Sequence, residues 1–135
     1  MIDGVAQTTF ERFCKKQRIT FAVLFGSSAR GRAMPHSDLD LAFWLPGKRL
    51  DGKELELTND LIQLLHRNDV DVVVLNHANA LLQWQVASTG RLLYEDHSGV
   101  FKQFQLLAFR RHQDAHRLYR WTEEYLDRVV TARHG

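Results

Sequence analysis

Three short apolar runs, separated by stretches with helical periodicity, restrict the fold of this chain more than any other feature. They are TFAVLF at residues 20–25, DLDLAFWL at residues 38–45 and DVDVVVL at residues 69–75. Runs this short and this rich in β-branched and aromatic residues predict buried strands rather than helices. A fourth, shorter strand is expected over residues 91–94.

The segments between these runs repeat their apolar residues at helical spacing. Helices are expected over residues 8–17, 55–66 and 78–88. Residues 98–131 are helical in pattern again, and a helix of that length outruns a small domain, so it is expected either to break or to project. The alternation predicts an α+β (or α/β-like) fold, in which a small mixed β-sheet is packed with helices and a long C-terminal helix follows.

Length and composition indicate one soluble domain. The 135 residues fit a single unit, with its core at about residues 8–95 and a C-terminal helical segment at about residues 98–131. The formal net charge of +2 is too small to favour nucleic acid as the main partner. The single cysteine, Cys14, rules out an internal disulfide and is expected to be a small buried hydrophobe. Neither a signal peptide nor an apolar run of the ~20 residues that a membrane span needs is found, so we expect a cytoplasmic protein.

Two aspartates, Asp38 and Asp40, stand at the start of the second apolar run. Side chains alternate between the faces of a strand, so both carboxylates are expected on one face, with Leu39, Leu41 and Phe43 on the other, toward the core. Two carboxylates this close raise each other's pKa unless a cation lies between them. Hard oxygen ligands suit Mg²⁺, so the pair predicts a magnesium site.

The third apolar run repeats the pattern with Asp69 and Asp71. If the two strands are neighbours, Asp71 can converge with Asp38 and Asp40 on one site. Three carboxylates can hold two metal ions ~4 Å apart, which is the arrangement that clamps an in-line phosphoryl displacement. Asp69 is the alternative third carboxylate. Asp71 is favoured because valines flank it in mid-strand, whereas Asp69 follows Asn68 at the strand entrance.

A glycine-rich turn, GSSARGR, follows the first apolar run. Gly26 lets the chain leave the strand with torsions that other residues avoid. Backbone N–H groups and the Ser27 hydroxyl can then form an anion site, to which Arg30 and Arg32 add positive charge. A phosphate cradle beside metal-binding carboxylates predicts a Mg²⁺-bound nucleoside triphosphate as the ligand. A P-loop is excluded because no Lys followed by Ser or Thr ends the turn.

These two features together resemble a known family. Gly26-Ser27, ten further residues and then Asp38-Leu39-Asp40 are similar to the GS-x10-DxD signature of the DNA polymerase β-like nucleotidyltransferase superfamily. The longer string LFGSSARGRAMPHSDLDLAF resembles the minimal nucleotidyltransferase (MNT) branch, and VDVVVLN resembles the strand that carries its third carboxylate. The resemblance spans about residues 21–126, with its most specific part in the twenty residues of the first string.

The resemblance implies a nucleotidyltransferase fold and a role for each matching residue of the turn. Gly26 and Ser27 would hold the β- and γ-phosphates of the nucleotide. Arg30 and Ser37 are assigned to the same nucleotide site. His36 lies in the same loop and is a candidate for touching the substrate.

For the carboxylates the resemblance implies metal binding and catalysis. Asp38 and Asp40 would bind two Mg²⁺ ions. Asp71 would bind one of them and help to deprotonate an acceptor hydroxyl, which attacks the α-phosphate of the nucleotide in line as pyrophosphate leaves.

Many MNT proteins act as antitoxins beside HEPN-domain ribonuclease toxins, and some transfer AMP from ATP to a toxin tyrosine. The resemblance therefore implies a Mg²⁺-dependent adenylyltransferase with ATP as substrate and a HEPN toxin as partner. Two alternatives remain open: an antitoxin that acts by binding alone, and a nucleotidyltransferase for a small molecule such as an aminoglycoside.

Apolar residues recur at helical spacing near the C-terminus and allow two interpretations. They could cover the sheet or a neighbouring helix. They could instead form an exposed patch that docks a partner or a second copy, giving a homo-oligomer, because aromatic residues and arginine are favoured in such patches. The residues are Leu118, Trp121, Tyr125, Leu126 and Val129, accompanied by Arg117, Arg120 and Arg128.

Overall fold

The computed structural model describes residues 5–26 and 38–134. In chain order the elements are α1 (Gln7–Lys16), β1 (Phe21–Phe25), β2 (Leu39–Trp44), α2 (Lys53–Leu65), β3 (Val70–Val74), a 3₁₀ turn (Leu75–His77), α3 (Ala80–Thr89), β4 (Arg91–Glu95) and α4 (Val100–His134). The strands form one sheet in the order β3-β2-β1-β4. β1 pairs antiparallel with both β2 and β4, whereas β2 and β3 are parallel. The predicted mixed sheet is confirmed, as is the type of every predicted element.

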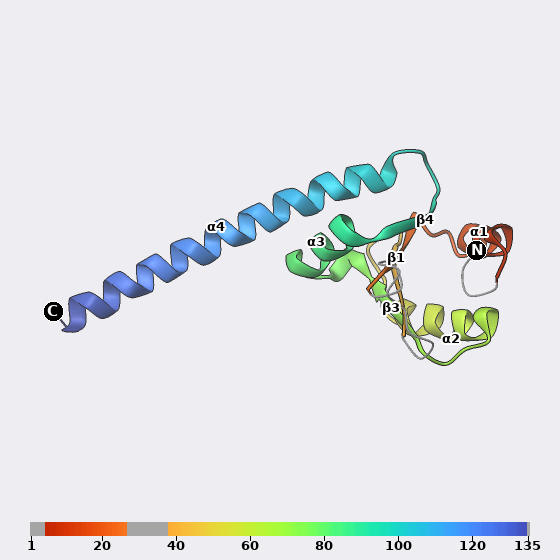
Figure 1. Cartoon of the computed structure of the whole chain (residues 1–135), viewed down its shortest axis with the longest axis horizontal. Coiled ribbons are helices and arrows are strands. Elements are labelled where there is room, and N and C mark those ends of the chain that lie inside the picture. Colours follow the sequence, from red (N-terminus) through yellow and green to blue (C-terminus); the bar gives the residue numbers. More distant parts are fainter. Residues whose placement is uncertain (1–4, 27–37, 135) are drawn as a thin grey trace.

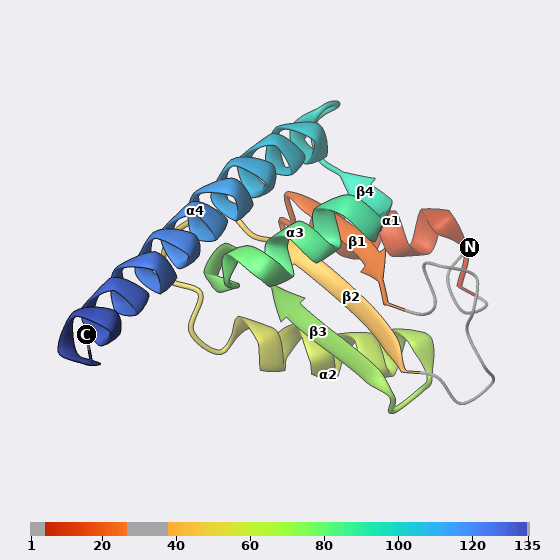
Figure 2. The same cartoon turned by 60° about the vertical axis from the view of Figure 1, so that its left-hand side comes forward.

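One face of the sheet packs against α1 and α2. The alternation of β2 and β3 places their larger apolar residues on this face, as predicted, where Phe10 and Cys14 of α1 and Leu57 and Leu61 of α2 meet them. Figure 2 shows α2 behind β3. The strand residues concerned are Leu39, Leu41, Phe43, Val70, Val72 and Val74, all buried.

The other face carries α3 and the first part of α4, which lie in front of the sheet in Figure 2. Phe21 is the centre of this second core, because its ring centroid lies 5.4 Å from that of Phe101 and 5.0 Å from that of Phe104. Ala108, one turn further along α4, is also fully buried. Successive residues of β1 therefore face different layers, which explains why this strand is an almost unbroken apolar run.

α4 is a single unbroken helix of 35 residues, about 52 Å long at 1.5 Å per residue. Figure 1 shows that its C-terminal half projects away from the sheet. The side chains of residues 113–132 are exposed except for Val129, which is half-buried. The interpretation that this segment covers the sheet or a neighbouring helix is wrong, since Leu118, Trp121 and Tyr125 are 63%, 59% and 50% exposed. No helix in the described residues is long and apolar enough to cross a bilayer, α4 included.

A small polar network fixes the point where α4 leaves the body. Gln83 of α3 is buried; its Nε2 donates to the Leu75 carbonyl at 2.8 Å, and its Oε1 accepts from Nη1 of Arg111 at 3.1 Å. The Trp84 ring stacks on the ring of His112 with centroids 5.4 Å apart. Both polar atoms of the buried amide thus have a partner. Among the described residues, Arg111 and His112 are the last residues of α4 with a hydrogen bond or ring contact to α3.

Candidate active site

The parallel pairing of β2 and β3 brings two of the predicted site residues together. Asp40 and Asp71 are direct partners in the ladder, and Phe25, the last residue of β1, is the partner of Asp40 on its other side. Neighbouring strands lie about 4.8 Å apart, and residues paired across them point to the same face. The two carboxylates therefore leave the same face of the sheet, where β1 ends and β2 and β3 begin.

Asp38 lies directly before β2 rather than inside it, which corrects the predicted start of the strand. The ladder begins one residue later, where the Leu39 N–H donates to the Asp69 carbonyl at 2.8 Å. Asp38 is exposed. Its charge still reaches Asp40, so the predicted neighbourhood of these two carboxylates is present although only one of them belongs to the strand.

The pKa of Asp40 shows that the three aspartates lie close enough to form one cluster. The pKa of Asp40 is raised, first by burial, then by the negative charge of Asp71 and then by that of Asp38. Among the described residues, no group of three or more His, Cys, Asp or Glu side chains already has the arrangement of a metal site. The three carboxylates therefore repel one another across a common space without the closed geometry of a bound ion.

The alternative third carboxylate, Asp69, is engaged elsewhere. Its two carboxylate oxygens accept from Nε and Nη2 of Arg67 in a bidentate pair. Such a planar pair fixes the direction of the carboxylate. Asp71, by contrast, is exposed and lies opposite Asp40 in the ladder. The geometry thus favours Asp71 over Asp69 for a role beside Asp40.

Gly26 begins the turn that follows β1 and lies against Asp40. Its φ of +74° belongs to the left-handed region, and a Cβ built on it would lie 2.3 Å from Oδ2 of Asp40. Any larger residue would have to displace that carboxylate as well as adopt a strained backbone. No sequence pattern indicates this close approach. The start of the glycine-rich turn and the carboxylate cluster are therefore parts of one site.

The remaining predicted residues of the turn lie outside the described part of the chain. These are Ser27, Arg30, Arg32, His36 and Ser37. Their assignment to the nucleotide stays a prediction.

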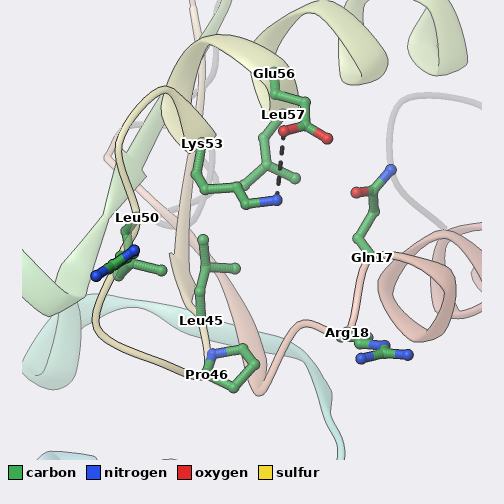
Figure 3. A pocket seen from close by; sticks show the side chains of 9 residues that line it. Gln17, Arg18, Leu45, Pro46, Leu50, Lys53, Glu56 and Leu57 are labelled. Atoms are coloured by element: carbon green, nitrogen blue, oxygen red, sulfur yellow. Dashed lines mark hydrogen bonds and ion pairs between the residues drawn. The ribbon is translucent and has the colours of Figure 1, made fainter.

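A separate cavity of about 240 Å³ lies at the opposite end of β2 (Figure 3). Leu45 and Leu57 are among its lining residues, and Nζ of Lys53, on its rim, lies 3.4 Å from Oε2 of Glu56. None of the three aspartates lines it. The cavity is therefore distinct from the carboxylate cluster.

A four-stranded mixed sheet with helices on both faces, whose central strand starts with clustered aspartates beside a glycine turn, defines a nucleotidyltransferase-type domain. The sequence matches the family described as "Polymerase beta, Nucleotidyltransferase" over residues 8–98. The chain belongs to this family and is a nucleotidyltransferase. The matched residues contain Gly26 and all three aspartates of the cluster. No curated protein matches the chain.

Solved structures share the fold over nearly the whole chain. A chain in the crystal structure of a toxin–antitoxin with AMP-PNP is 23% identical, with a TM-score of 0.73, covering 93% of this chain and 99% of that one. A chain of the MntA–HepT toxin–antitoxin is 21% identical, with a TM-score of 0.66 and coverages of 92% and 96%. A chain of the tri-AMPylated Shewanella oneidensis HEPN toxin in complex with MNT antitoxin is 23% identical, with a TM-score of 0.63 and coverages of 93% and 99%.

Proposed function

We propose that this protein transfers AMP from ATP to a tyrosine hydroxyl of a HEPN ribonuclease toxin and so acts as its antitoxin. The observation that carries the proposal is the pairing of Asp40 with Asp71 beside Gly26, in a chain of the polymerase beta nucleotidyltransferase family. The cytoplasm is the proposed location, because the single thiol of Cys14 fits a reducing compartment.

The carboxylate cluster fits Mg²⁺. Asp38, Asp40 and Asp71 offer only hard oxygen donors, and the mutual repulsion that raises the pKa of Asp40 is what a cation between them would relieve. We assign two ions to these three residues. When bound, the ions would supply charge neutralisation and Lewis-acid polarisation at the phosphates.

The residues of the chain then act mainly by positioning. Gly26 leaves the backbone accessible to the phosphates because it carries no side chain. Asp71 orients the acceptor hydroxyl and assists removal of its proton. The acceptor oxygen forms a bond to the α-phosphorus while the bond from that phosphorus to the bridging oxygen of pyrophosphate breaks.

A protein acceptor is supported by the openness of the site. β3 is an edge strand in the order β3-β2-β1-β4, and Asp71 on it is exposed. A side chain of another protein can therefore approach Asp71 from the edge of the sheet. ATP and a HEPN partner are supported by the similar structures, one of which holds AMP-PNP and another a tri-AMPylated HEPN toxin.

Intact-protein mass spectrometry tests the proposal. The full chain is incubated with ATP and Mg²⁺, with and without the product of the neighbouring gene, and the variant Asp38→Ala/Asp40→Ala is the blank. We expect additions of AMP mass on the partner that the blank does not make. Turnover on an aminoglycoside with no protein adduct would instead support a small-molecule acceptor.

A second candidate function is neutralisation of a toxin by binding alone, and the exposed apolar side chains of α4 favour it. Asp40→Asn separates the two functions, because it removes one charge from the cluster without touching α4. Protection of cells by Asp40→Asn, with the complex intact, would support binding as the mechanism.

A further inference from the structure

The apolar stripe of α4 continues beyond the part that the body covers. Phe101, Phe104 and Ala108 are buried against the body. The same alternation of three and four residues runs on through Arg111 to the end of the helix. It is the heptad repeat typical of helices that pack along their length. The continuation, here called the free stripe, consists of Ala115, Leu118, Thr122, Tyr125, Val129 and Ala132.

The body stops covering this stripe at a defined residue. Hydrogen bonds and ring contacts from α3 to α4, within the described residues, end at Arg111 and His112. Beyond them the helix continues for about 33 Å. Trp121 and Tyr125 stack with ring centroids 5.8 Å apart, and their side chains are 59% and 50% exposed. An isolated helical segment with such a face is marginal in water, so the free stripe requires a cover.

We propose that the free stripe is covered by the free stripe of a second copy of this chain, in an antiparallel pair of α4 helices. A parallel pair is sterically excluded, because α3 of each copy already occupies the stripe up to His112 and the two bodies would compete for one space. In an antiparallel pair each body lies beyond the end of the other helix.

The two ends of the exposed segment determine the register. The overlap must begin after His112 and finish at the end of α4, which centres the pair between Glu123 and Glu124. Thr122 then faces Tyr125 of the second copy. By the same symmetry Leu118 faces Val129, and Ala115 faces Ala132. No layer brings two large side chains together, so the two helices can pack closely along the stripe.

The residues beside the stripe are complementary in this register. Trp121 lies next to Arg128 of the second copy, a cation–π arrangement that occurs twice. Tyr119 lies next to Leu126. The five large side chains at this interface are 50–66% exposed and show roughly 100 Å² each, so two copies can bury at most roughly 1,000 Å² in total; they are Leu118, Tyr119, Trp121, Tyr125 and Leu126. That area is at the lower end for a specific interface, so a concentration-dependent dimer is expected.

The arrangement leaves the active sites free. In Figure 2 the C-terminus of α4 lies on the opposite side of the molecule from the start of β2, where Asp40 stands. The two carboxylate clusters of the pair therefore lie at its far ends, accessible to nucleotide and acceptor.

Sedimentation velocity of the full chain over a range of concentrations tests the proposal. We expect a monomer–dimer equilibrium whose dissociation constant rises at least tenfold in Leu118→Glu and in Tyr125→Glu. The matched control is Leu106→Glu, the same change on the same helix at a residue that is 59% exposed but outside the stripe. Circular dichroism verifies that each variant is folded. Trp121→Ala, a milder truncation beside the free stripe, provides a second test of the same interface.

Cysteine cross-linking tests the register. An equimolar mixture of Leu118→Cys and Val129→Cys should form a disulfide-linked heterodimer on oxidation, while neither variant alone should cross-link. Cross-linking of Leu118→Cys with itself would overturn the antiparallel arrangement. A monomer at all concentrations would overturn the dimer, even if the stripe variants then lost binding to a coexpressed toxin, because the stripe would in that case belong to the toxin.

Discussion

Two regions of this molecule contain unfavourable surface of different kinds: one gathers like charges, and the other exposes apolar side chains to water. At the start of β2 and β3, Asp40, Asp71 and Asp38 bring like charges together in a partly buried place. In the second half of α4, Leu118 and Trp121 expose apolar surface to water. Within the described part of the chain, only burial and like charges act on the Asp40 carboxylate, and nothing covers the exposed side chains of α4. Departures of this kind are expected where a chain is shaped for something that it binds.

The difference between the regions lies in what would satisfy each of them. The carboxylate cluster is rigidly built, since hydrogen-bonded strands hold Asp40 and Asp71 in register. A small ion can complete it without any change in the fold. The free stripe needs a surface of comparable length, which only another macromolecule provides. In the two proposals made above, the chemistry and the binding of a second copy are thus assigned to opposite ends of the molecule.

The largest expected effect comes from removing one of the clustered charges. Asp40→Asn should lower adenylyl transfer roughly 1,000-fold, because it removes preorganised charge where the phosphates bind. The same variant should raise the melting temperature of the metal-free protein by a few degrees at most, since repulsion and a buried charge are both relieved. Transfer assays and calorimetry on one sample measure both effects. A lower melting temperature without metal would contradict the idea of a strained cluster.

A matched pair on β3 and its entrance sharpens the assignment of the third carboxylate. Asp71→Asn should reduce transfer at least 100-fold, whereas Asp69→Asn should change it less than tenfold, because Asp69 is paired with Arg67. Single-turnover transfer rates at saturating ATP measure the difference. Equal losses in the two variants would argue that both aspartates serve the reaction.

Truncating one large side chain in each half of α4 tests whether the body covers the second half of the helix. Phe104→Ala should lower the free energy of unfolding by about 3–5 kcal/mol, because a buried ring is replaced by a cavity. Tyr125→Ala should change it by less than about 0.5 kcal/mol at concentrations where the chain is monomeric. Urea unfolding measures both. A large loss for Tyr125→Ala in the monomer would mean that the body covers the free stripe after all.

A smaller effect is expected at Gly26. Gly26→Ala should cost about 1–3 kcal/mol of stability, since the new Cβ meets Asp40 and the backbone has φ of +74°. Thermal unfolding measures it, with Gly47→Ala as the control: Gly47 has a similar φ of +89°, but a Cβ at that position would have nothing within 4 Å. If the two variants are equally destabilised, only the backbone conformation matters and the contact with Asp40 does not.

Cys14 provides the mildest contrast, a buried titratable group that is neutral under ordinary conditions. Burial raises the pKa of its thiol from 9.0 to about 12. The folded state thus holds the proton more firmly than the unfolded one, so stability is unaffected below pH 9 and falls as pH rises toward 12. At pH 10 the loss should be about 1.4 kcal/mol. Urea unfolding between about pH 8 and pH 10 measures it, and in Cys14→Ala this part of the slope should disappear.

Alternation in the sequence was sufficient to predict the strands and their faces. Leu41 and Val72 turn to the core, and Asp40 and Asp71 turn away, because side chains on a strand have only two directions. The convergence of those aspartates depended on the two strands being neighbours, which alternation alone does not determine. The start of β2 was predicted one residue early, because the hydrogen bond from Leu39 to Asp69 is a long-range contact.

Periodicity failed to decide the course of α4 for a different physical reason. The heptad spacing is the same from Phe101 to Ala108 as from Ala115 to Ala132. The spacing predicts that one face of a helix is apolar, but it does not predict which molecule covers that face. The close approach of Gly26 to Asp40 was equally hidden, since it joins residues that only folding brings together.

The register of the parallel ladder between β2 and β3 determines both the packing of the core and the position of Asp71 beside Asp40. If β3 slipped by one residue against β2, Asp71 would turn into the layer where Val70 and Val72 now meet α2, and valines would take its place beside Asp40. Under the proposed antitoxin function, a slipped chain would therefore lose its site and its core packing together, and selection for a stable fold would also preserve the catalytic residues.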